Sequence, residues 1–571
     1  MSFDLIPEPQ SVTLNGEAAD SDDAGAPVPV ALPLVGRISE DRDIDDIAGV
    51  FPTQLADDIE AATGLRWDIA SDVMVAGLPA PNAATAHPVP PHASCWKSFI
   101  TLRLDPSSLE PQEYRLTIAR SGIDVVGGDT EGVRNGVQTL RQIIRQCAPA
   151  LPRLVIADKP AYKVRGYYLD ATRGRVPTLD WLKTWADRLC LYKYNQLQLY
   201  IEHTFMFDDL SETWRGTSPL KPADIIAFDE YCARLGIELV PSVSTFGHQY
   251  MAMRTRELRH LGEFPEDADR RYGFVERQRH HTLNITEPES LAFSFKLIDA
   301  YMQLFRTRKF NICGDETFDL GRGRSKPEAE RRGVAAMYAD FVSQLCRHLS
   351  ERGREPMFWG DIAVEMPQIL GLLPDNVTLL NWLYAPGIGE DKVRLVAQAG
   401  APQYVCSAVW CWNALLPRLD DSWNNISRLA RYGVKYGAVG YLVTDWGDYG
   451  HVNDPRMAVS GMIFGAQCAW NPMAHIQGEA GCGDGEGGSA AGYADAAADE
   501  EDVLALPLLV ELQRLFCVIH DKLLLFFFDQ SINFIQVILL FAFRSDGSAE
   551  RLRHPPPGID AEGIIKRRFV P

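Results

Sequence analysis

The sequence predicts an α/β protein in which a (β/α)8 TIM barrel follows a small α+β domain. The first observation lies between residues 160 and 472, where short apolar segments alternate with amphipathic segments of helical periodicity. The second is their number, because eight β-then-α units over about 300 residues are what a closed barrel requires. The third is the change of pattern before residue 155, where strand-like alternation is followed by one amphipathic stretch.

Residues 1–155 are expected to form the small α+β domain. Apolar and polar residues alternate with the two-residue period of a half-buried strand at 98–104, 114–119 and 122–127. In residues 131–146 the apolar side chains recur instead at helical spacing. The Lys-Pro pair at 159–160 indicates a turn between this domain and the next.

In the barrel region each expected strand is followed by an expected helix. The strands are 164–170, 196–202, 238–244, 310–314, 357–361, 378–383, 404–410 and 438–444. The helices are 180–192, 223–235, 289–306, 329–352, 391–399, 421–432 and 457–469, with a short piece at 364–370. A doubly wound open sheet is the alternative. It is less favoured because eight uninterrupted strands slightly exceed its usual number and no glycine-rich phosphate loop follows the first strand.

Composition limits the partners of the chain. Its 571 residues predict two or three domains, and 46% hydrophobic with 23% charged residues is ordinary for a globular protein. The net charge of −20 argues against binding nucleic acid, whose phosphates repel an acidic surface. The eleven cysteines show no CxxC or Cys/His ligand spacing, which favours a reducing compartment and no structural metal. No cofactor is expected.

The two ends of the chain give expectations about location. The segment that begins at Met1 lacks the basic region and apolar core of a signal peptide, which favours a cytoplasmic protein. Residues 474–501 are rich in Gly, Ala, Asp and Glu and are expected to be a low-complexity linker. Residues 502–571 form an apolar tail without an assigned role. Within it, 523–543 is long enough to span a membrane, but its acidic and amide residues favour a buried element.

The fourth predicted strand ends in Gly314-Asp315-Glu316. Placing two unpaired carboxylates at the edge of a core costs free energy. Two like charges this close also raise the pKa of one of the carboxyls, and a general acid that works near neutral pH needs a raised pKa. An isolated Asp-Glu pair is more often a solvated strand end or a helix cap. The residues at the other strand ends favour the catalytic interpretation, because a TIM barrel places its ligand site where the carboxyl ends of the strands meet.

Aromatic and charged side chains also stand at or just after the ends of most of the remaining predicted strands. These residues are Asp170, Arg173, Glu202, His203, His248, Trp359, Asp361, Trp382, Tyr384, Trp410, Trp412, Trp446 and Asp448. Such a rim suits a pyranose ring, because aromatic faces cover its C–H faces while carboxylates and Arg bind its hydroxyls. A single Trp is more often core packing, but five tryptophans beside carboxylates favour a sugar site. His203 and His248 lack a third and fourth ligand, so a metal site is not expected.

These motifs together resemble glycoside hydrolase family 20, the β-N-acetylhexosaminidases. Gly314-Asp315-Glu316 after a strand resembles the family signature. Further resemblances lie at 164–173 in the first barrel strand, at Gly247-His248 and at Trp446-Gly447-Asp448 in the last strand. Residues 5–9 and 136–142 resemble the domain that precedes the barrel in this family. The resemblance covers about residues 3–470, and it implies the same two-domain fold.

The resemblance also implies an exo-acting retaining enzyme that hydrolyses terminal β-linked GlcNAc or GalNAc by substrate-assisted catalysis. The acetamido oxygen of the substrate would attack its own anomeric carbon and form an oxazolinium intermediate. Glu316 would be the acid and then the base, and Asp315 would orient the acetamido group. The implied substrate-binding residues are Arg165, His248, Trp359, Trp382, Tyr384, Trp446 and Asp448.

Two segments depart from the family pattern. The second strand ends in Tyr200-Ile201-Glu202-His203 instead of His-x-x-x-Asp. Trp410 and Trp412 stand where the tyrosine that donates to the acetamido oxygen is expected, which leaves Tyr384 and Tyr404 as candidates.

Two alternative functions stay open at this point. One is a (β/α)8 glycosidase that uses separated carboxylates, with Asp315 or Glu316 acting together with Asp361 or Asp448. The other is a catalytically silent sugar-binding protein. The preferred sugar, the linkage and the oligomeric state are left open by the sequence.

Overall fold

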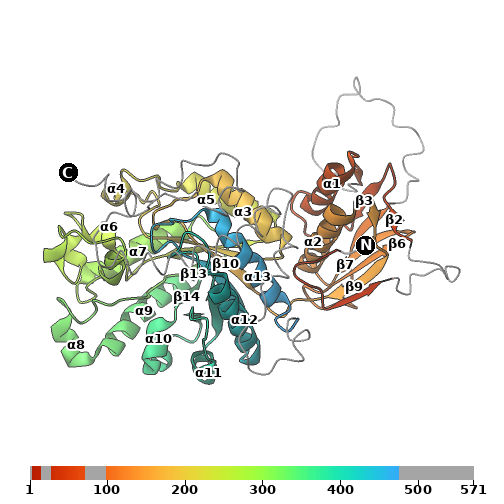
Figure 1. The fold of residues 1–571 in the computed structure, drawn as a ribbon. Helices are drawn as coiled ribbons and strands as arrows, with labels where there is room; N and C mark the ends of the chain where they lie inside the picture. Colours follow the sequence, from red (N-terminus) through yellow and green to blue (C-terminus); the bar gives the residue numbers. More distant parts are fainter. Residues whose placement is uncertain (1–2, 15–27, 71–97, 475–571) are drawn as a thin grey trace, which may run out of the picture. The chain divides into compact units, whose positions relative to one another are not determined.

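The computed structural model describes residues 3–14, 28–70 and 98–474 (Figure 1). The expected linker after residue 474 and the expected apolar tail, with its segment 523–543, lie outside these residues. Within the described residues, no helix is long and apolar enough to cross a membrane.

The N-terminal domain is built on a mixed sheet. Its strands are β1 (Ser11–Leu14), β3 (Arg37–Glu40), β4 (Asp68–Ala70), β5 (Ile100–Leu104), β6 (Tyr114–Ala119), β7 (Gly122–Gly127) and β9 (Leu154–Asp158). They form a seven-stranded sheet in the order β1-β9-β6-β7-β5-β3-β4. A second, two-stranded sheet pairs β2 (Val30–Ala31) with β8 (Ala150–Leu151). The domain therefore continues a little past residue 155, to the end of β9.

Two helices, α1 (Val50–Thr63) and α2 (Thr130–Cys147), pack on the same side of this sheet (Figure 1). The Asp129 side chain caps α2 by accepting the N–H of Gly132 at 2.7 Å. The apolar face of α2, with Val137 and Leu140 at its centre, is completely buried against the strands. This side of the sheet carries the core of the small domain, and the sequence predicted α2 but not α1.

The second domain is a closed barrel of eight parallel strands, as predicted. These are β10 (Arg165–Asp170), β11 (Gln196–Ile201), β12 (Glu238–Val243), β13 (Lys309–Asn311), β14 (Glu355–Trp359), β15 (Thr378–Trp382), β16 (Gln403–Ala408) and β17 (Gly440–Asp445). Each strand pairs with the next, and β10 pairs with β17 in parallel to close the barrel. The carboxyl ends of all eight strands therefore meet at one rim.

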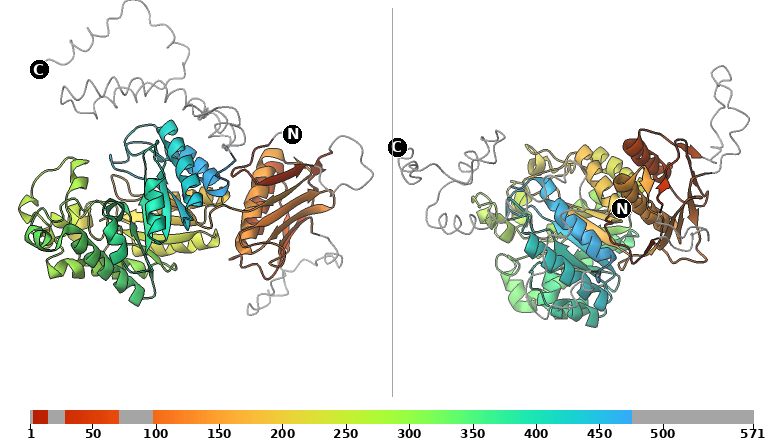
Figure 2. Two further views of the ribbon diagram at one scale, coloured as in Figure 1. Left: turned by 90° about the horizontal axis from the view of Figure 1, so that it is seen from below. Right: turned by 45° about the vertical axis from the view of Figure 1, so that its right-hand side comes forward.

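Helices surround the strands (Figures 1 and 2). The longer ones are α3 (Leu179–Leu191), α5 (Pro222–Arg234), α7 (Pro288–Met302), α9 (Val334–Glu351), α11 (Asp391–Gln398), α12 (Leu419–Lys435) and α13 (Val459–Trp470). Short helices follow the strand ends: α4 (Ser211–Trp214), α6 (Tyr250–Met253), α8 (Lys326–Arg332) and α10 (Asp361–Glu365). The short 3₁₀ helices after β12, β14 and β17 are Arg259–Leu261, Pro265–Asp267, Glu276–Arg279, Pro367–Leu372 and Pro455–Ala458.

Two predicted helices differ from the observed ones. The expected helix at 329–352 is broken into α8 and α9 at Gly333, which has φ 82°. A residue in this left-handed region ends an α-helix, and glycine adopts it at little cost. The expected short piece at 364–370 spans the end of α10 and the 3₁₀ helix Pro367–Leu372.

The longest connection at the rim joins β12 to α7, from Ser244 to Glu287. Its two ends are hydrogen-bonded to each other. Near its start, the N–H of Gln249 donates to the carbonyl of His281 at 3.0 Å, and the N–H of Leu283 donates to the carbonyl of Phe246 at 3.1 Å. Gln278 extends across to the opposite wall, where its Nε2 donates to the main-chain carbonyl of Asp448 at 2.5 Å.

Candidate active site

The turn after β13 places the two adjacent carboxylates at the rim. Three of its four residues have positive φ, namely Cys313 (60°), Gly314 (79°) and Glu316 (48°). Only glycine adopts this region freely, so the surrounding structure must hold the other two residues in it. The consequence is a strand that ends at Asn311, earlier than predicted, and a sharp bend that carries Asp315 and Glu316.

Hydrogen bonds hold this turn in place. The Asn311 side chain accepts the N–H of Cys313 at 2.9 Å, and the Tyr338 hydroxyl donates to the carbonyl of Gly314 at 2.8 Å. At the far end of the turn, Asp361 Oδ2 accepts the N–H of Glu316 at 3.1 Å. The backbone of the turn is thus fixed from its own strand, from α9 and from the start of α10.

One histidine stands between the two carboxylates. The Nε2 atom of His248 lies 3.5 Å from Asp315 Oδ2 and 3.5 Å from Glu316 Oε2. The side chain of Asp315 is 10% exposed and that of Glu316 is 31% exposed, so Asp315 lies deeper. Burial lowers the pKa of His248, but the two carboxylates outweigh it and raise that pKa above its ordinary value.

The environment of Glu316 suits a proton donor. Its pKa is raised above the ordinary value, first by burial and then by the negative charge of Asp315, while His248 works in the opposite direction. A carboxyl group that keeps its proton toward neutral pH can act as a general acid.

Arg173 links three strand ends at the rim. It follows β10, and its Nη1 lies 2.5 Å from Asp448 Oδ1 after β17, while its Nε lies 3.1 Å from Glu202 Oε1 after β11. The guanidinium also stands 5.0 Å from the centre of the Trp446 ring. Burial raises the pKa of Glu202, but His203 and Arg173 hold it well below its ordinary value. This region is therefore a fixed array of paired charges.

The structure does not bring Arg165 to this site. Arg165 is the first residue of β10, at the opposite end of the barrel from the rim. Its buried guanidinium donates to Gln112 at 2.6 Å and to Glu131 at 2.8 Å, both in the small domain, and also to the carbonyl of Lys193. Arg165 therefore lies away from the rim, contrary to the expectation that it binds sugar hydroxyls, and Arg173 is an arginine that lies at the rim.

Trp446 is the centre of the aromatic part of the rim. Its ring lies 4.8 Å from Tyr168, 5.2 Å from Tyr200 and 5.7 Å from Trp359, centre to centre. Its indole N–H donates to the hydroxyl oxygen of Tyr384 at 2.7 Å. Trp359 is completely buried beneath this group.

A second aromatic row continues from Tyr384. Its ring centre lies 5.1 Å from Trp382 and 5.5 Å from Trp412, and Trp412 stacks on Trp410 at 4.7 Å. These four residues are half-buried. The predicted residues Trp359, Trp382, Tyr384 and Trp446 are therefore gathered in one aromatic wall.

Tyr404, the other candidate for the acetamido-binding tyrosine, lies away from the rim. It is the second residue of β16, and the groups that influence its pKa are Gln196, Glu238 and Glu355, which all begin their own strands. Tyr404 therefore belongs to the end of the barrel that faces away from Asp315 and Glu316. Of the two candidates, Tyr384 is the one at the site.

With this geometry described, the chain can be compared with known proteins. The model of the glycosyl hydrolase family 20 catalytic domain matches residues 162–412, and the model of domain 2 of that family matches residues 46–159. The chain belongs to glycoside hydrolase family 20.

Relatives of known name agree with this assignment. A β-hexosaminidase of Akkermansia muciniphila is 30% identical over 341 residues, which cover 53% of this chain and 65% of that protein. A lacto-N-biosidase of Bifidobacterium bifidum is 26% identical over 315 residues, covering 52% of this chain and 26% of that protein. The chain thus spans less than two thirds of the length of either relative.

Solved family 20 structures share the fold. The exo β-N-acetylglucosaminidase of Vibrio harveyi, solved with N-acetylglucosamine, aligns with a TM-score of 0.62 at 16% identity, covering 83% of this chain and 76% of that chain. The β-hexosaminidase of Streptomyces plicatus, in complex with Thio-NAglucal, aligns with a TM-score of 0.60 at 19% identity, covering 82% and 90%.

In this family 20 chain, several buried polar atoms of the site have no hydrogen-bond partner among the described residues. They are both ring nitrogens of His248, Asp315 Oδ1, Asp361 Oδ1, Trp359 Nε1 and His203 Nδ1. Buried polar groups are normally paired, so a cluster of unpaired ones marks a place where ligand or water completes the bonding. The cluster coincides with the acid pair and the aromatic wall.

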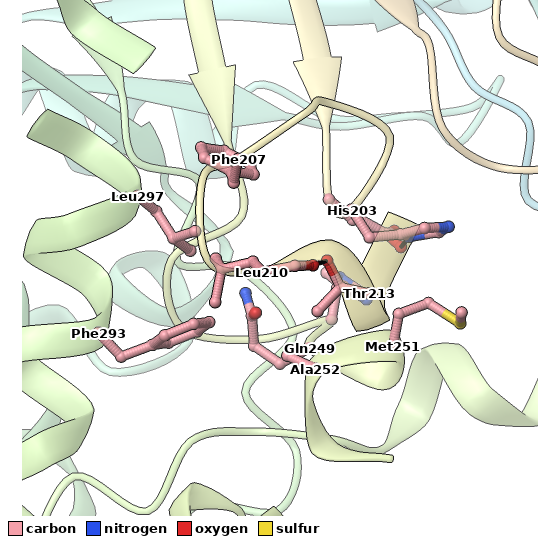
Figure 3. Close-up of a pocket in the computed structure, with 11 residues that line it drawn as sticks. His203, Phe207, Leu210, Thr213, Gln249, Met251, Ala252, Phe293 and Leu297 are labelled. Atoms are coloured by element: carbon pink, nitrogen blue, oxygen red, sulfur yellow. Dashed lines mark hydrogen bonds and ion pairs between the residues drawn. The ribbon is translucent and has the colours of Figure 1, made fainter. Parts of the chain in front are cut away.

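The family 20 site also has a small pocket beside the acid pair (Figure 3). Glu202, His203, His248 and Gln249 supply its polar side, and the rest comes from the segment after β11, including Phe207, from α6 and from α7. Neither Asp315, Glu316 nor the tryptophans of the aromatic wall line it. It therefore backs the histidine instead of forming the sugar subsite.

One group of ligand-type atoms in the described residues is close enough to hold a cation. It consists of His248, Asp315 and Glu316, whose ligand atoms lie within 4.8 Å of one another. The acid pair and the histidine between its carboxylates already account for this cluster, so we assign no metal to it.

One residue of the family 20 site, Gln278, escaped the sequence analysis, and another, Arg173, was placed at the rim without a binding role of its own. Gln278 contacts the main chain of Asp448 from the long loop after β12, and nothing in its sequence context distinguishes it from a surface residue. Arg173 was noticed at the strand end but not chosen. The position along the strand distinguishes the two arginines. Arg165 precedes the strand's apolar residues and Arg173 follows Asp170 at its end, and only residues at the carboxyl end of a barrel strand reach the rim.

Proposed function

We propose that this chain is an exo-acting β-N-acetylhexosaminidase that hydrolyses terminal β-linked GlcNAc or GalNAc with retention, by substrate-assisted catalysis. The observation that carries the proposal is the position of Asp315 and Glu316 on one turn, both 3.5 Å from His248 Nε2 and beside an aromatic wall. Adjacent carboxylates on one turn cannot serve as acid and nucleophile on opposite faces of a sugar, so the substrate has to supply the nucleophile.

Glu316 is the proton donor in this proposal. It gives its proton to the departing glycosidic oxygen while the acetamido oxygen of the substrate forms a bond to the anomeric carbon. Glu316 then removes a proton from the water that opens the oxazolinium ion. The raised pKa of Glu316 supports the first step, since the group must be protonated when substrate binds.

Asp315 orients the acetamido group and stabilises the positive charge that develops on its nitrogen. Its deeper position, with a side chain 10% exposed, supports this division of roles. His248 balances the charges of the pair. Since burial strengthens electrostatic interactions, a carboxylate fixed next to the developing charge contributes most where water is excluded.

Tyr384 donates a hydrogen bond to the acetamido oxygen. Its hydroxyl oxygen accepts the indole N–H of Trp446, so its own proton is directed to another acceptor, which is the Thr444 hydroxyl or the substrate. Trp446 stacks on the sugar face and Trp382 flanks the acetamido group, while the completely buried Trp359 supports Trp446 from beneath. Arg173 and Asp448, which pair with each other at the rim, bind the remaining hydroxyls.

The two alternatives have less support. Asp361 is a poor second carboxylate, because its Oδ1 is shut off from solvent and its Oδ2 is engaged by the backbone of Glu316. Asp448 is paired with Arg173. A silent sugar-binding protein has no need of an acid with a raised pKa next to a second carboxylate. The β-hexosaminidase named among the relatives also favours the enzyme.

The test is hydrolysis of 4-nitrophenyl β-GlcNAc, β-GalNAc and β-glucoside by the wild type, Glu316→Gln and Asp315→Asn. We expect activity on the acetamido sugars alone, and a loss of at least about 100-fold in kcat in each variant. Activity on the glucoside, or near-normal activity of Asp315→Asn, would exclude substrate assistance. If a thiazoline analogue of the intermediate binds but no substrate is cleaved, the chain is a sugar-binding protein.

A further inference from the structure

Asp361 contacts the proposed acid through its backbone. It is the first residue of α10, directly after Gly360 at the end of β14, and its Oδ2 accepts the N–H of Glu316 at 3.1 Å. Glu316 has φ 48°, a conformation that a residue with a side chain rarely adopts without an external partner. The hydrogen bond that Asp361 accepts therefore helps to hold this residue of the turn.

The other carboxyl oxygen of Asp361 is isolated. Oδ1 is inaccessible to solvent and has no hydrogen-bond partner, and the same is true of Asp315 Oδ1. Within the described ranges Asp361 forms no ion pair, whereas His248 serves Asp315 and Glu316. A buried carboxylate without a cation is strongly disfavoured compared with its protonated form.

The groups that face Asp361 come from three elements. The turn after β13 contributes the carboxyls of Asp315 and Glu316, α9 contributes the phenol of Tyr338, and α10 itself contributes the N–H of Ile362. Only the two backbone N–H groups favour a charged Asp361. Both neighbouring carboxyls oppose it.

We propose that Asp361 is a positioning residue that remains a neutral carboxylic acid, with its carbonyl oxygen on the Glu316 N–H and its proton on the buried oxygen. Burial and the charge of Asp315, which together raise the pKa of Asp361 well above its ordinary value, agree with this assignment. The turn is thereby held without adding a further negative charge next to Asp315 and Glu316. The kinetic part of this inference rests on the proposed function.

The direct test is infrared spectroscopy of the unliganded protein near neutral pH. A protonated carboxylic acid has a C=O stretching band well separated from those of carboxylates. We expect this band in the difference between wild type and Asp361→Asn. If Asp361→Asn leaves the carboxylic-acid region unchanged, Asp361 is ionised and the proposal is overturned. This measurement needs no substrate, so it keeps its meaning even if the proposed function fails.

Kinetics with an aryl β-GlcNAc supply the second test, with two substitutions that differ in one property. Asp361→Asn keeps a neutral group with an acceptor oxygen for Glu316, and Asp361→Ala removes the acceptor. We expect Asp361→Ala to lose about 100-fold in kcat with little change in KM, because a misplacement of about 1 Å costs that much. Asp361→Asn is expected to recover at least about tenfold of this loss.

The pH profile separates a neutral Asp361 from a charged one. If it is neutral in the wild type, Asp361→Asn leaves the alkaline pKa of kcat/KM in place. If it is charged, removing that charge lowers the alkaline pKa by about one unit, because a nearby negative charge raises the pKa of an acid. Such a shift would overturn the proposal, as would equal losses of kcat in the Asp361→Asn and Asp361→Ala variants.

Thermal melting of both variants shows whether they are folded. If Asp361→Ala is not folded, the infrared band and the pH profile of Asp361→Asn still decide the question.

Discussion

The indole N–H of Trp446 donates a 2.7 Å hydrogen bond to the hydroxyl oxygen of Tyr384, joining the rim after β17 to the rim after β15. This bond fixes the Tyr384 oxygen as an acceptor and directs its proton elsewhere. It also holds the ring of Trp446 in one orientation, beneath the guanidinium of Arg173. The proposed sugar platform and the proposed acetamido donor are thus one unit.

We therefore expect Tyr384→Phe to lower kcat for an aryl β-GlcNAc by about 10- to 100-fold, the usual effect of removing one hydrogen bond to a reacting group. The matched control is Tyr404→Phe, which removes the same atom at the other end of the barrel. Steady-state kinetics of both variants decide the matter. Equal, small effects would show that Tyr384 does not contact the acetamido group.

Arg173 and Arg165 are expected to separate function from stability. Arg173→Met should reduce kcat/KM about 10- to 100-fold, because charged hydrogen bonds to substrate are worth about 1.5–3 kcal/mol. Arg165→Met should instead lower the melting temperature, since it removes the buried guanidinium that binds Glu131 and Gln112 at the boundary between the two domains. The Arg165→Met protein that remains folded should have the same kcat/KM as the wild type. A large kinetic effect of Arg165→Met in folded protein would reverse this assignment.

The alkaline limb of the pH profile should report the proton on Glu316. Activity requires the protonated acid, so kcat/KM falls as pH rises through its pKa, which burial and Asp315 raise above the ordinary 4.5. An aryl substrate whose leaving group departs without protonation should show a weaker limb. An identical limb for good and poor leaving groups would assign it to some other residue.

Glu40 in the small domain should make stability depend on pH. Burial, together with Asp46 and Asp41, raises its pKa to about 8, whereas the unfolded value is 4.5. The folded protein therefore holds this proton more tightly, and the stabilisation is complete below 4.5 and is lost as pH rises through about 8.

Glu40→Gln keeps the uncharged form at every pH. We expect it to raise the melting temperature at about pH 9, by about 2–4 °C for each kcal/mol recovered, and to have little effect at about pH 5. Glu351→Gln, at an exposed position where α9 ends, is the control. An equal change at both pH values would show that Glu40 acts through packing and not through its charge.

The barrel could be predicted because its strands are short apolar runs that end in polar residues, as at Leu169-Asp170 and Thr444-Asp445. The outer strands of the small domain escaped prediction because they carry no such contrast. All four residues of β1, for example, are exposed, so its sequence has no buried face to reveal.

Much of the candidate site followed from the rule that barrel ligands sit at the carboxyl ends of strands. The two residues that were wrongly considered for the site stand at the beginning of a strand and not at its end. Arg165 and Tyr404 begin strands β10 and β16 and therefore lie at the other end. The turn at Cys313 was also missed, because its positive φ depends on contacts from Tyr338 and Asp361 that are distant in sequence.

The connection of three loops through the single guanidinium of Arg173 has a consequence for directed evolution. Because Arg173, Glu202 and Asp448 share their charges, the effect of a substitution at one position depends on the residues at the other two. A search for altered sugar preference that changes these positions one at a time will discard combinations whose members fail alone. Libraries that randomise the three codons together are the better route to new specificities.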